Sequence, residues 1–550
     1  MEDDKLGSSV KTIETDGGYS IVLELFKNDP LFDKKKKLLN DKGLGIKEQI
    51  NLKCSLTPDS LTTTYEKMLQ MARILHLDEV ELYFSEDVCS SKEIYSPKNE
   101  VEALNSILLK VDMLLSSMHK QMDILKVFRD SVIDRIHELG VDKMESRVDK
   151  SLSCENEKCL LHWGESNGVR TRLQIAGIEG YGRGALAIED LNVGDIALEI
   201  PVSIIISEEC VYQSDMYQIL EKIDGISSET MMLLWSMREK RNTNSKFKTY
   251  FDTLPEAFNT GLSFGVDAIM ALDGTLMLEE IMQAKEHLRL QYDEIFPALC
   301  NDHPDIFPPE LYTWECFLWA CELWYSNSMK VMFADGKLRT CLIPIGGFLN
   351  HSLDPHIVHY GKVDSATNSL KFPLSRPCHK GEQCYLSYGN LSSSHLITFY
   401  GFMPQGDNPY DVIPLDININ EAESDEGCPV TNWTTHMVRG TWMSNNHDIF
   451  CYGLPSPLLN CFRRARSPVL HNNNLVQENL EIEKEVLEDI QYTFSDMMEN
   501  LGDMDFIDRE NTSWDVKLAL EFKDLQKRIL SSILTSCSAG LKLIENKLSK

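Results

Sequence analysis

Three short segments in the middle of the chain contain residue types that can bind a small molecule or take part in a reaction. The first is the glycine-rich run 180–184, whose glycines let the backbone approach a ligand closely and adopt positive φ. The second is the apolar run 343–349, which ends in Asn350, His351 and Ser352. Because buried Asn and His side chains need hydrogen-bond partners, this polar triplet forms either a local turn network or a ligand contact.

The third segment is the stretch 381–389, which contains Tyr388 and is followed by Phe399-Tyr400-Gly401-Phe402. Tyrosines in such a place are either core aromatics with a satisfied hydroxyl or groups that meet a substrate. The glycine-rich run is not a dinucleotide fingerprint, because the G-x-G-x-x-G spacing and a following long helix are both missing.

In this order the three segments strongly resemble the SET-domain methyltransferases, which have a G-x-G turn, then Asn-His-Ser, then a Gly-Glu segment ending in Tyr, with Tyr-Gly-Phe downstream. The part between the first two segments resembles the subgroup that includes Rubisco large-subunit methyltransferase. The residues that resemble this subgroup are Leu233-Leu234, Tyr250-Phe251, Leu254-Pro255, Leu272-Asp273-Gly274-Thr275 and Trp319-Ala320. The resemblance covers about 161–402 and implies S-adenosylmethionine as the cofactor.

The resemblance also implies a role for the residues of the first two motifs. The backbone around Tyr181, Gly182 and Arg183 is expected to hold the methionine part of the cofactor. Asn350 and His351 are expected to hold its adenosyl part.

Two tyrosines are expected to meet the substrate. By the same resemblance, Tyr388 is the catalytic tyrosine beside the cofactor's methyl group, and Tyr400 lines the channel for the substrate side chain. Methyl transfer is an in-line displacement at a sulfonium, so the enzyme mainly aligns a neutral amine roughly 3 to 3.5 Å from the methyl carbon. A desolvated aromatic channel near a cationic cofactor disfavours the charged form of a lysine, whose ordinary pKa is about 10.4.

Two positions depart from the pattern of the subgroup. Its members often carry an acidic residue three positions before the Asn of Asn-His, where this chain has Gly347. They also tend to have an arginine shortly after the Trp-Ala helix, but the window 326–333 offers only Lys330 as a cation. Arg170 or Arg172 could hold the cofactor's carboxylate instead.

The leading expectation is therefore an S-adenosylmethionine-dependent protein-lysine N-methyltransferase. The cysteine-rich segment that follows the SET core in many histone methyltransferases is not recognisable, which favours a non-histone protein substrate. Two alternatives stay open. One is a protein-histidine N-methyltransferase, and the other is a catalytically weak or inactive SET-fold scaffold that binds other proteins through its helices.

Composition narrows the partners and the location. The net charge of -31 argues against nucleic acid, because phosphate binding depends on clustered Lys and Arg. No apolar run approaches the roughly 18 residues that span a membrane, and the acidic N-terminus suggests the cytoplasm or the nucleus. No metal is expected, because Cys154, Cys159 and His162 have irregular spacing and no second ligand pair follows.

The elements that must position these residues form an α+β architecture. A disordered lead-in is expected over 1–55 and a helical region over 56–150, where apolar residues recur at helical spacing. A β-rich SET domain is expected over 151–405, split by a helical insertion over about 210–320. A helical domain that faintly resembles the subgroup's substrate-binding domain is expected over 406–550.

Overall fold

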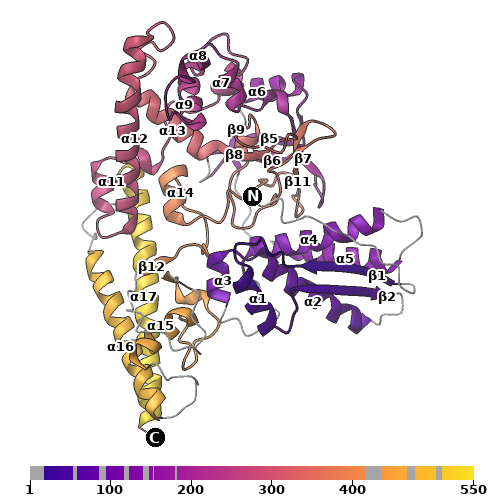
Figure 1. The fold of residues 1–550 in the computed structure, drawn as a ribbon, viewed down its shortest axis with the longest axis vertical. Helices are drawn as coiled ribbons and strands as arrows, with labels where there is room; N and C mark the ends of the chain where they lie inside the picture. Colours follow the sequence, from indigo (N-terminus) through magenta and orange to yellow (C-terminus); the bar gives the residue numbers. More distant parts are fainter. Residues whose placement is uncertain are drawn as a thin grey trace.

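The computed structural model describes residues 18–53, 58–85, 95–116, 123–139, 148–152, 154–179, 182–415, 433, 435–467, 477–502, 509 and 511–549. These residues form an N-terminal lobe, a central domain and a C-terminal lobe (Figure 1). The combination of many helices with small, mainly antiparallel sheets confirms the predicted α+β class. Within the described part of the chain, no helix is both long enough and apolar enough to cross a membrane.

The N-terminal lobe packs a two-stranded antiparallel sheet against helices. Its elements are β1 (Gly18–Glu24), α1 (Phe32–Asp41), β2 (Lys47–Lys53), α2 (Pro58–His76), α3 (Glu79–Ser85), α4 (Pro97–Ser116) and α5 (Asp123–Glu138). Inside the lobe, the Arg73 guanidinium donates to both carboxylate oxygens of Glu100 at 2.6 and 2.8 Å. This buried pair joins α2 to α4, and its two-pronged geometry offsets the cost of burying both charges.

The sequence-based prediction of a disordered lead-in over 1–55 is wrong for 18–53. In β1, Ile21 and Leu23 point into the core of the lobe, and Ile50 and Leu52 do the same from β2. Alternate residues of a strand share one face, so this pattern of period two buries one side of the sheet. Val22 between Ile21 and Leu23 is apolar as well, so the sequence of β1 does not show this alternation clearly.

The central domain contains three small sheets, with strand orders β10-β11-β7-β4, β3-β5-β6 and β8-β9. The strands are β3 (Val148–Leu152), β4 (Arg170–Thr171), β5 (Leu173–Ile178), β6 (Gly182–Ala187), β7 (Ile196–Pro201), β8 (Ser328–Met332), β9 (Leu338–Leu342), β10 (Val363–Asp364) and β11 (Ser369–Pro373). Leu198 of β7 lies opposite Phe372 of β11. Stretches on either side of a long helical segment therefore build one sheet.

Helices of the central domain lie above these sheets and along their left side (Figure 1). They are α6 (Glu155–Ser166), α7 (Glu208–Tyr212), α8 (Tyr217–Leu220), α9 (Ser228–Glu239), α10 (Lys248–Phe251), α11 (Val266–Ala271), α12 (Leu276–Asp302), α13 (Trp314–Asn327) and α14 (Ser393–Tyr400). Helix α14 begins where the Ser392 hydroxyl accepts a hydrogen bond from the His395 N–H, and it ends at Gly401 in the left-handed conformation. This helix fixes Tyr400 at its last turn.

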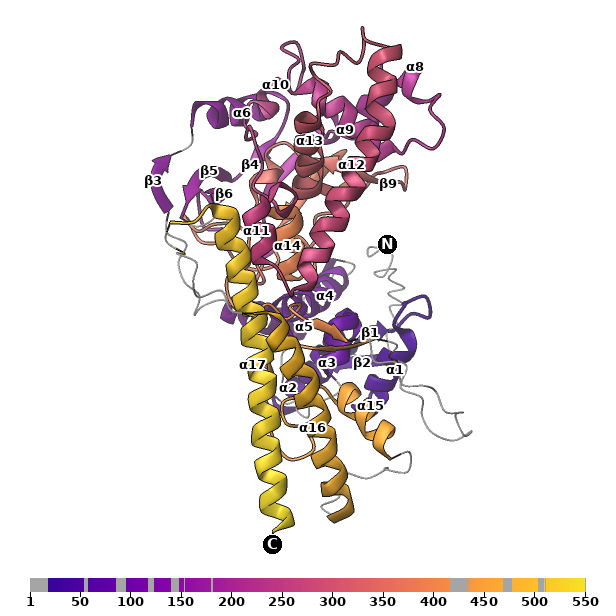
Figure 2. The ribbon, with the colours of Figure 1, turned by 90° about the vertical axis from the view of Figure 1, so that its left-hand side faces the viewer.

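The C-terminal lobe is built on two long helices that run side by side (Figure 2). Its elements are β12 (Ile413–Leu415), β13 (His436–Val438), α15 (Ser456–Arg466), α16 (Gln477–Asn500) and α17 (Trp514–Leu548). The lobe also contacts the N-terminal lobe, because the Tyr83 hydroxyl lies 3.1 Å from Nδ1 of His436 and its ring meets Trp433 edge-on at 5.0 Å. The N-terminal and C-terminal lobes thus pack on each other.

Candidate active site

The polar triplet lies against the glycine-rich strand β6. Asn350 Nδ2 donates to the carbonyl oxygen of Arg183 at 2.9 Å and to Oε1 of Gln383 at 2.7 Å. A Cβ at Gly184 would lie 2.5 Å from Gln383 Oε1 and 3.0 Å from Asn350 Nδ2, so glycine is needed for this close approach. Sequence reasoning missed Gln383, whose position beside Cys384 and Tyr385 suggested only a strand.

The glycine turn itself is open on one side. Gly182 has a φ of 72°, and a Cβ there would meet nothing within 4 Å. The Arg183 guanidinium is paired with Glu157 of α6, so only its backbone is directed to Asn350. Tyr181 lies outside the described residues.

His351 supports the backbone of the predicted catalytic tyrosine. Its Nδ1 accepts a hydrogen bond from the Tyr388 N–H at 3.0 Å, which requires an imidazole with its proton on Nε2. Burial, reinforced by the charge of Lys98, lowers the pKa of His351 to about 4. The Nε2 atom is buried and has no hydrogen-bond partner. A buried donor of this kind is a ready contact for a bound ligand.

Tyr388 and Tyr400 form an aromatic pair. Their rings are stacked with centroids 4.9 Å apart at an angle of 25°, and Phe402 meets Tyr388 edge-on at 6.4 Å. The Tyr388 hydroxyl donates to the Leu349 carbonyl oxygen at 3.2 Å. Burial raises the pKa of Tyr388 above its ordinary value, so the hydroxyl stays neutral and can orient a partner without adding negative charge.

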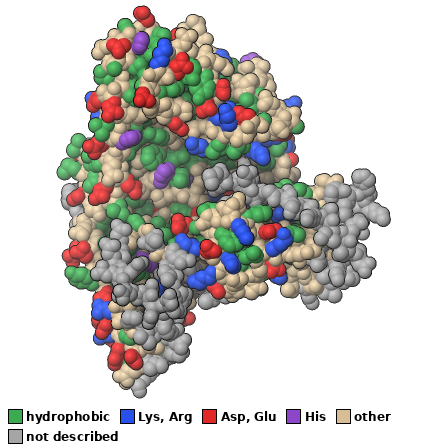
Figure 3. Space-filling model, in the orientation of Figure 1, with side chains coloured by type: hydrophobic (Ala, Val, Ile, Leu, Met, Phe, Trp, Pro, Cys, Tyr) green, Lys and Arg blue, Asp and Glu red, His purple; other side chains and the backbone are tan. Residues whose placement is uncertain are grey.

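A cleft of about 1210 Å³ reaches this aromatic pair from between the central domain and the N-terminal lobe. On one side it is lined by Leu349, Tyr388 and Tyr400, and on the other by β1 and Lys98. Figure 3 shows hydrophobic side chains gathered along the hollowed face between the central domain and the lobes below it. The predicted site residues described by the structure are therefore gathered around Asn350 and His351, and the cleft leads to the tyrosines.

Comparison with solved structures identifies the fold. A structure of Rubisco LSMT bound to sinefungin and monomethyllysine aligns with 72% of this chain and 94% of its own, with a TM-score of 0.53 and 17% identity. This chain has the SET-domain fold and resembles Rubisco LSMT.

Curated relatives of the SET-fold chain are distant. The Rubisco large-subunit N-methyltransferase of Pisum sativum is 24% identical over 276 residues, which are 48% of this chain and 54% of the relative. The actin-histidine N-methyltransferase of Gallus gallus is 22% identical over 275 residues, which are 48% of this chain and 45% of the relative. The chain spans about half the length of the curated relatives that it matches.

A family model described as Rubisco LSMT substrate-binding matches residues 26–132. These residues form most of the N-terminal lobe, which precedes the SET domain in the chain. From the sequence, the resemblance to a substrate-binding domain was expected for 406–550 instead. The lobe with the matching family model is also the lobe that lines the cleft.

Gly347, the first departure from the subgroup's pattern, lies beside a residue of the window 326–333, where the expected arginine is missing. A Cβ at Gly347 would lie 3.4 Å from Oδ1 of Asn327, the last residue of α13, and both positions line the cleft. Lys330 donates to the Thr340 hydroxyl at 2.9 Å, and Arg172 is paired with Glu189 at 2.6 Å. The cleft therefore has a neutral amide beside the place where an acidic side chain was expected.

The described residues that could gather around a metal ion are His356, Cys378 and Cys384, whose candidate ligand atoms lie within 4.8 Å of one another. Both ring nitrogens of His356 have other contacts, because Nδ1 accepts from the Tyr385 N–H at 3.1 Å and Nε2 lies 3.2 Å from Glu382. A neutral histidine that binds a metal through Nε2 carries its proton on Nδ1, where it would face the Tyr385 N–H. This cluster therefore fits a buried hydrogen-bond network better than a metal site.

Replacing Asn350 with alanine should weaken cofactor binding. The substitution leaves Arg183 and Gln383 without their shared partner, and the loss of one hydrogen-bonding side chain is expected to lower affinity roughly tenfold. Calorimetry with S-adenosylmethionine measures this. Asn156→Ala is the control, because it removes a surface hydrogen bond to the Asp252 carbonyl. Equal affinities in both variants would make Asn350 a structural turn residue.

His351 should remain neutral at mildly acidic pH. Its folded pKa of about 4 lies below the ordinary value of 6.5, so the unfolded chain binds more protons between these two values. Stability should therefore fall as the pH drops through this window, by on the order of 2 to 3 kcal/mol from this residue. Titration of the His351 ring signal by NMR gives the pKa directly. A midpoint near 6.5 would contradict the arrangement with Tyr388.

Proposed function

We propose that this chain is an S-adenosylmethionine-dependent protein N-methyltransferase, with a lysine side chain as its first candidate target. The observation that carries the proposal is the Tyr388 hydroxyl, held at the Leu349 carbonyl and stacked on Tyr400 where the cleft ends. The SET fold and the distant relatives, whose names include a lysine N-methyltransferase and a histidine N-methyltransferase, support it.

The residues present are compatible with the cofactor. The open turn at Gly182 allows close approach of the backbone, and the unpartnered Nε2–H of His351 can donate to a ligand. The cleft of about 1210 Å³ exceeds the roughly 300 to 1,000 Å³ usual for small-molecule sites, which leaves space for part of a protein substrate beside Tyr388 and Tyr400. Asn350, His351 and the backbone at Gly182 and Arg183 would hold the cofactor.

When bound, the cofactor supplies a methyl group on a positively charged sulfur. The rings of Tyr388 and Tyr400 exclude water from the substrate amine, which lowers its pKa and favours loss of its proton to solvent. The Tyr388 hydroxyl and the Leu349 carbonyl then orient the nitrogen lone pair toward the methyl carbon. A nitrogen–carbon bond forms as the carbon–sulfur bond breaks. No group on the enzyme needs to carry a full negative charge.

A non-histone protein is the proposed substrate, and the cytoplasm or the nucleus is the proposed location. Histidine is the second candidate target, because relatives at similar identity include actin-histidine N-methyltransferases. A flat ring would occupy the space beside Tyr388 and Tyr400 differently from a lysine stem, so the shape of this channel would decide between them.

The test combines the purified chain with tritiated S-adenosylmethionine and two probe proteins, the Rubisco large subunit and actin. Label on lysine, mapped by mass spectrometry, supports the leading proposal, whereas label on histidine supports the second candidate. Tyr388→Phe is run beside the parent to show that the label depends on this site.

The departures at Gly347 and in the window 326–333, which offers only Lys330 as a cation, make an inactive scaffold the alternative from another class. Calorimetry separates it from an enzyme whose substrate is neither probe. Measurable S-adenosylmethionine binding supports an enzyme, whereas absence of binding together with absence of label would overturn the proposed function.

A further inference from the structure

The segment that carries Tyr388 is held by hydrogen bonds from within the SET domain. The Tyr360 hydroxyl donates to the Ser387 carbonyl oxygen at 2.5 Å, and the Tyr388 N–H donates to His351 at 3.0 Å. Gly389 follows with a φ of 128°. As a glycine, it has no side chain that could hold the segment. The next residue, Asn390, is exposed and extends toward the N-terminal lobe.

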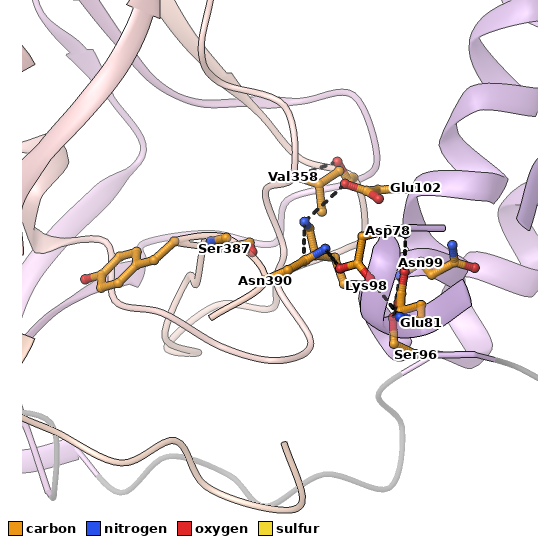
Figure 4. Close-up of polar contacts among 12 residues, drawn as sticks. Asp78, Glu81, Ser96, Lys98, Asn99, Glu102, Val358, Ser387 and Asn390 are labelled. Carbon is orange, nitrogen blue, oxygen red and sulfur yellow. Dashed lines mark hydrogen bonds and ion pairs between the residues drawn. The ribbon is translucent and has the colours of Figure 1, made fainter. Parts of the chain in front are cut away.

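The N-terminal lobe binds both polar atoms of the Asn390 side chain (Figure 4). Nδ2 of Asn390 donates to the Asp78 carboxylate, and Oδ1 accepts from the Lys98 ammonium at 2.8 Å. Lys98 also lies 3.5 Å from Glu102 on the same helix, which fixes the direction of its side chain. These contacts join residues that are far apart in the sequence.

The two partners of Asn390 are themselves fixed at helix starts. The second carboxylate oxygen of Asp78 accepts from the Glu81 N–H at 2.8 Å at the beginning of α3. Glu81 in turn accepts from the Ser96 hydroxyl at 2.5 Å, and Ser96 accepts from the Asn99 N–H at 3.1 Å at the beginning of α4. The starts of both helices are thus connected, and Lys98 stands on the second.

We infer that Asn390 is a positioning residue through which the N-terminal lobe holds the Tyr388 segment in its active geometry, an inference that rests on the proposed function. Asp78, Lys98 and Asn390 form an interlobe clamp. The lobe that lines one side of the cleft would thereby also set the alignment of the tyrosine on the other side.

Two features explain why a contact two residues away from Tyr388 matters. Glycine is the residue with the greatest backbone freedom, so Gly389 would let the segment move if Asn390 were released. Lys98 also acts on His351, since its positive charge disfavours the imidazolium that could not accept the Tyr388 N–H. Small displacements of a reacting group can cost a large part of the rate.

Hydrogen exchange on the full chain tests the clamp without any substrate. In Asn390→Ala, amides in the peptide 384–392 should exchange about tenfold faster than in the parent, because local opening becomes easier. The matched control is Asn105→Ala, which removes a different hydrogen bond from the N-terminal lobe, to the Ser375 carbonyl at 2.8 Å. The control should leave exchange in 384–392 unchanged.

A swap of functional groups tests the pairing itself. Asn390→Asp places a carboxylate against Asp78 and should loosen the segment as Asn390→Ala does. Adding Asp78→Asn restores a donor opposite an acceptor and leaves a carboxylate oxygen at position 390 to accept from the Lys98 ammonium, so the double variant should recover slow exchange. Activity is measured on whichever of actin and the Rubisco large subunit is methylated. In Asn390→Ala and in Asn390→Asp, kcat should fall while KM stays constant. In the double variant, kcat should recover.

Unchanged exchange of 384–392 in Asn390→Ala would overturn the clamp, and so would failure of the double variant to recover. Exchange is measured without cofactor or substrate. A chain that neither binds S-adenosylmethionine nor labels a probe would therefore refute the proposed function, whereas the exchange result decides the clamp separately.

Discussion

Tyr388→Phe should fold and bind the cofactor almost normally but lose methyl-transfer activity by roughly a hundredfold or more. The substitution keeps the ring that stacks on Tyr400 and removes only the hydroxyl that donates to the Leu349 carbonyl oxygen. Without this hydroxyl, the carbonyl loses its partner and the substrate nitrogen loses one of the groups that orient it. Single-turnover methylation of a labelled probe protein and calorimetry with S-adenosylmethionine measure the two effects.

Tyr400→Phe is the matched variant, and it should be milder. It keeps the stack of the two rings. In the proposed alignment the Tyr388 hydroxyl orients the substrate nitrogen, whereas the Tyr400 hydroxyl has no such role. We expect a changed rate or a changed number of methyl groups. If Tyr388→Phe kept full activity and only lowered the melting temperature, Tyr388 would be a core tyrosine whose hydrogen bond is worth about 1 kcal/mol.

Gly401→Ala should strongly destabilise the SET domain. Gly401 ends α14 with a φ of 79°, and a Cβ there would lie 1.7 Å from the Asn259 carbonyl oxygen. The clash is with backbone, which cannot rotate away as a side chain could, and it adds to the strain of positive φ. We expect a loss of about 2 to 4 kcal/mol in the free energy of unfolding, measured by chemical denaturation.

Gly406→Ala is the control for this prediction. Gly406 has a φ of 88°, but a Cβ there would meet nothing within 4 Å. It should cost only about 1 kcal/mol, which is the strain of the backbone conformation alone. Equal losses in the two variants would show that the loop at Asn259 moves to make room. The glycine after Tyr400 would then not be required for packing.

The lobe that resembles a substrate-binding domain comes before the SET domain in the chain, not after it. The family model for Rubisco LSMT substrate-binding matches 26–132, ahead of the SET domain, and this lobe lines the cleft that ends at Tyr388 and Tyr400. The C-terminal helices α16 and α17 pack on each other, and α17 also reaches α11 of the SET domain. A role of 406–550 in binding the protein substrate remains a prediction.

The local sequence was sufficient to predict which residues would need hydrogen-bond partners at the site. The Asn-His-Ser triplet follows an apolar run, and such polar groups must find partners when they are buried. Their partners here include the Arg183 carbonyl and the Tyr388 N–H, both within the predicted motifs. Helical spacing in the same way predicted α4 and α5, because apolar residues three and four apart share one face of a helix.

The residues by themselves therefore determined which polar and aromatic groups need partners, because the chemistry of each side chain is local, and the resemblance to SET-domain methyltransferases predicted that they serve one site. Only the tertiary structure decided which distant groups complete it. Gln383 receives Asn350 through a side chain that has no special spacing, and Asn390 meets Asp78 and Lys98 from the other lobe. Contacts of this kind depend on how separate elements pack, and neither hydrophobic period nor motif spacing encodes the direction in which one lobe faces another.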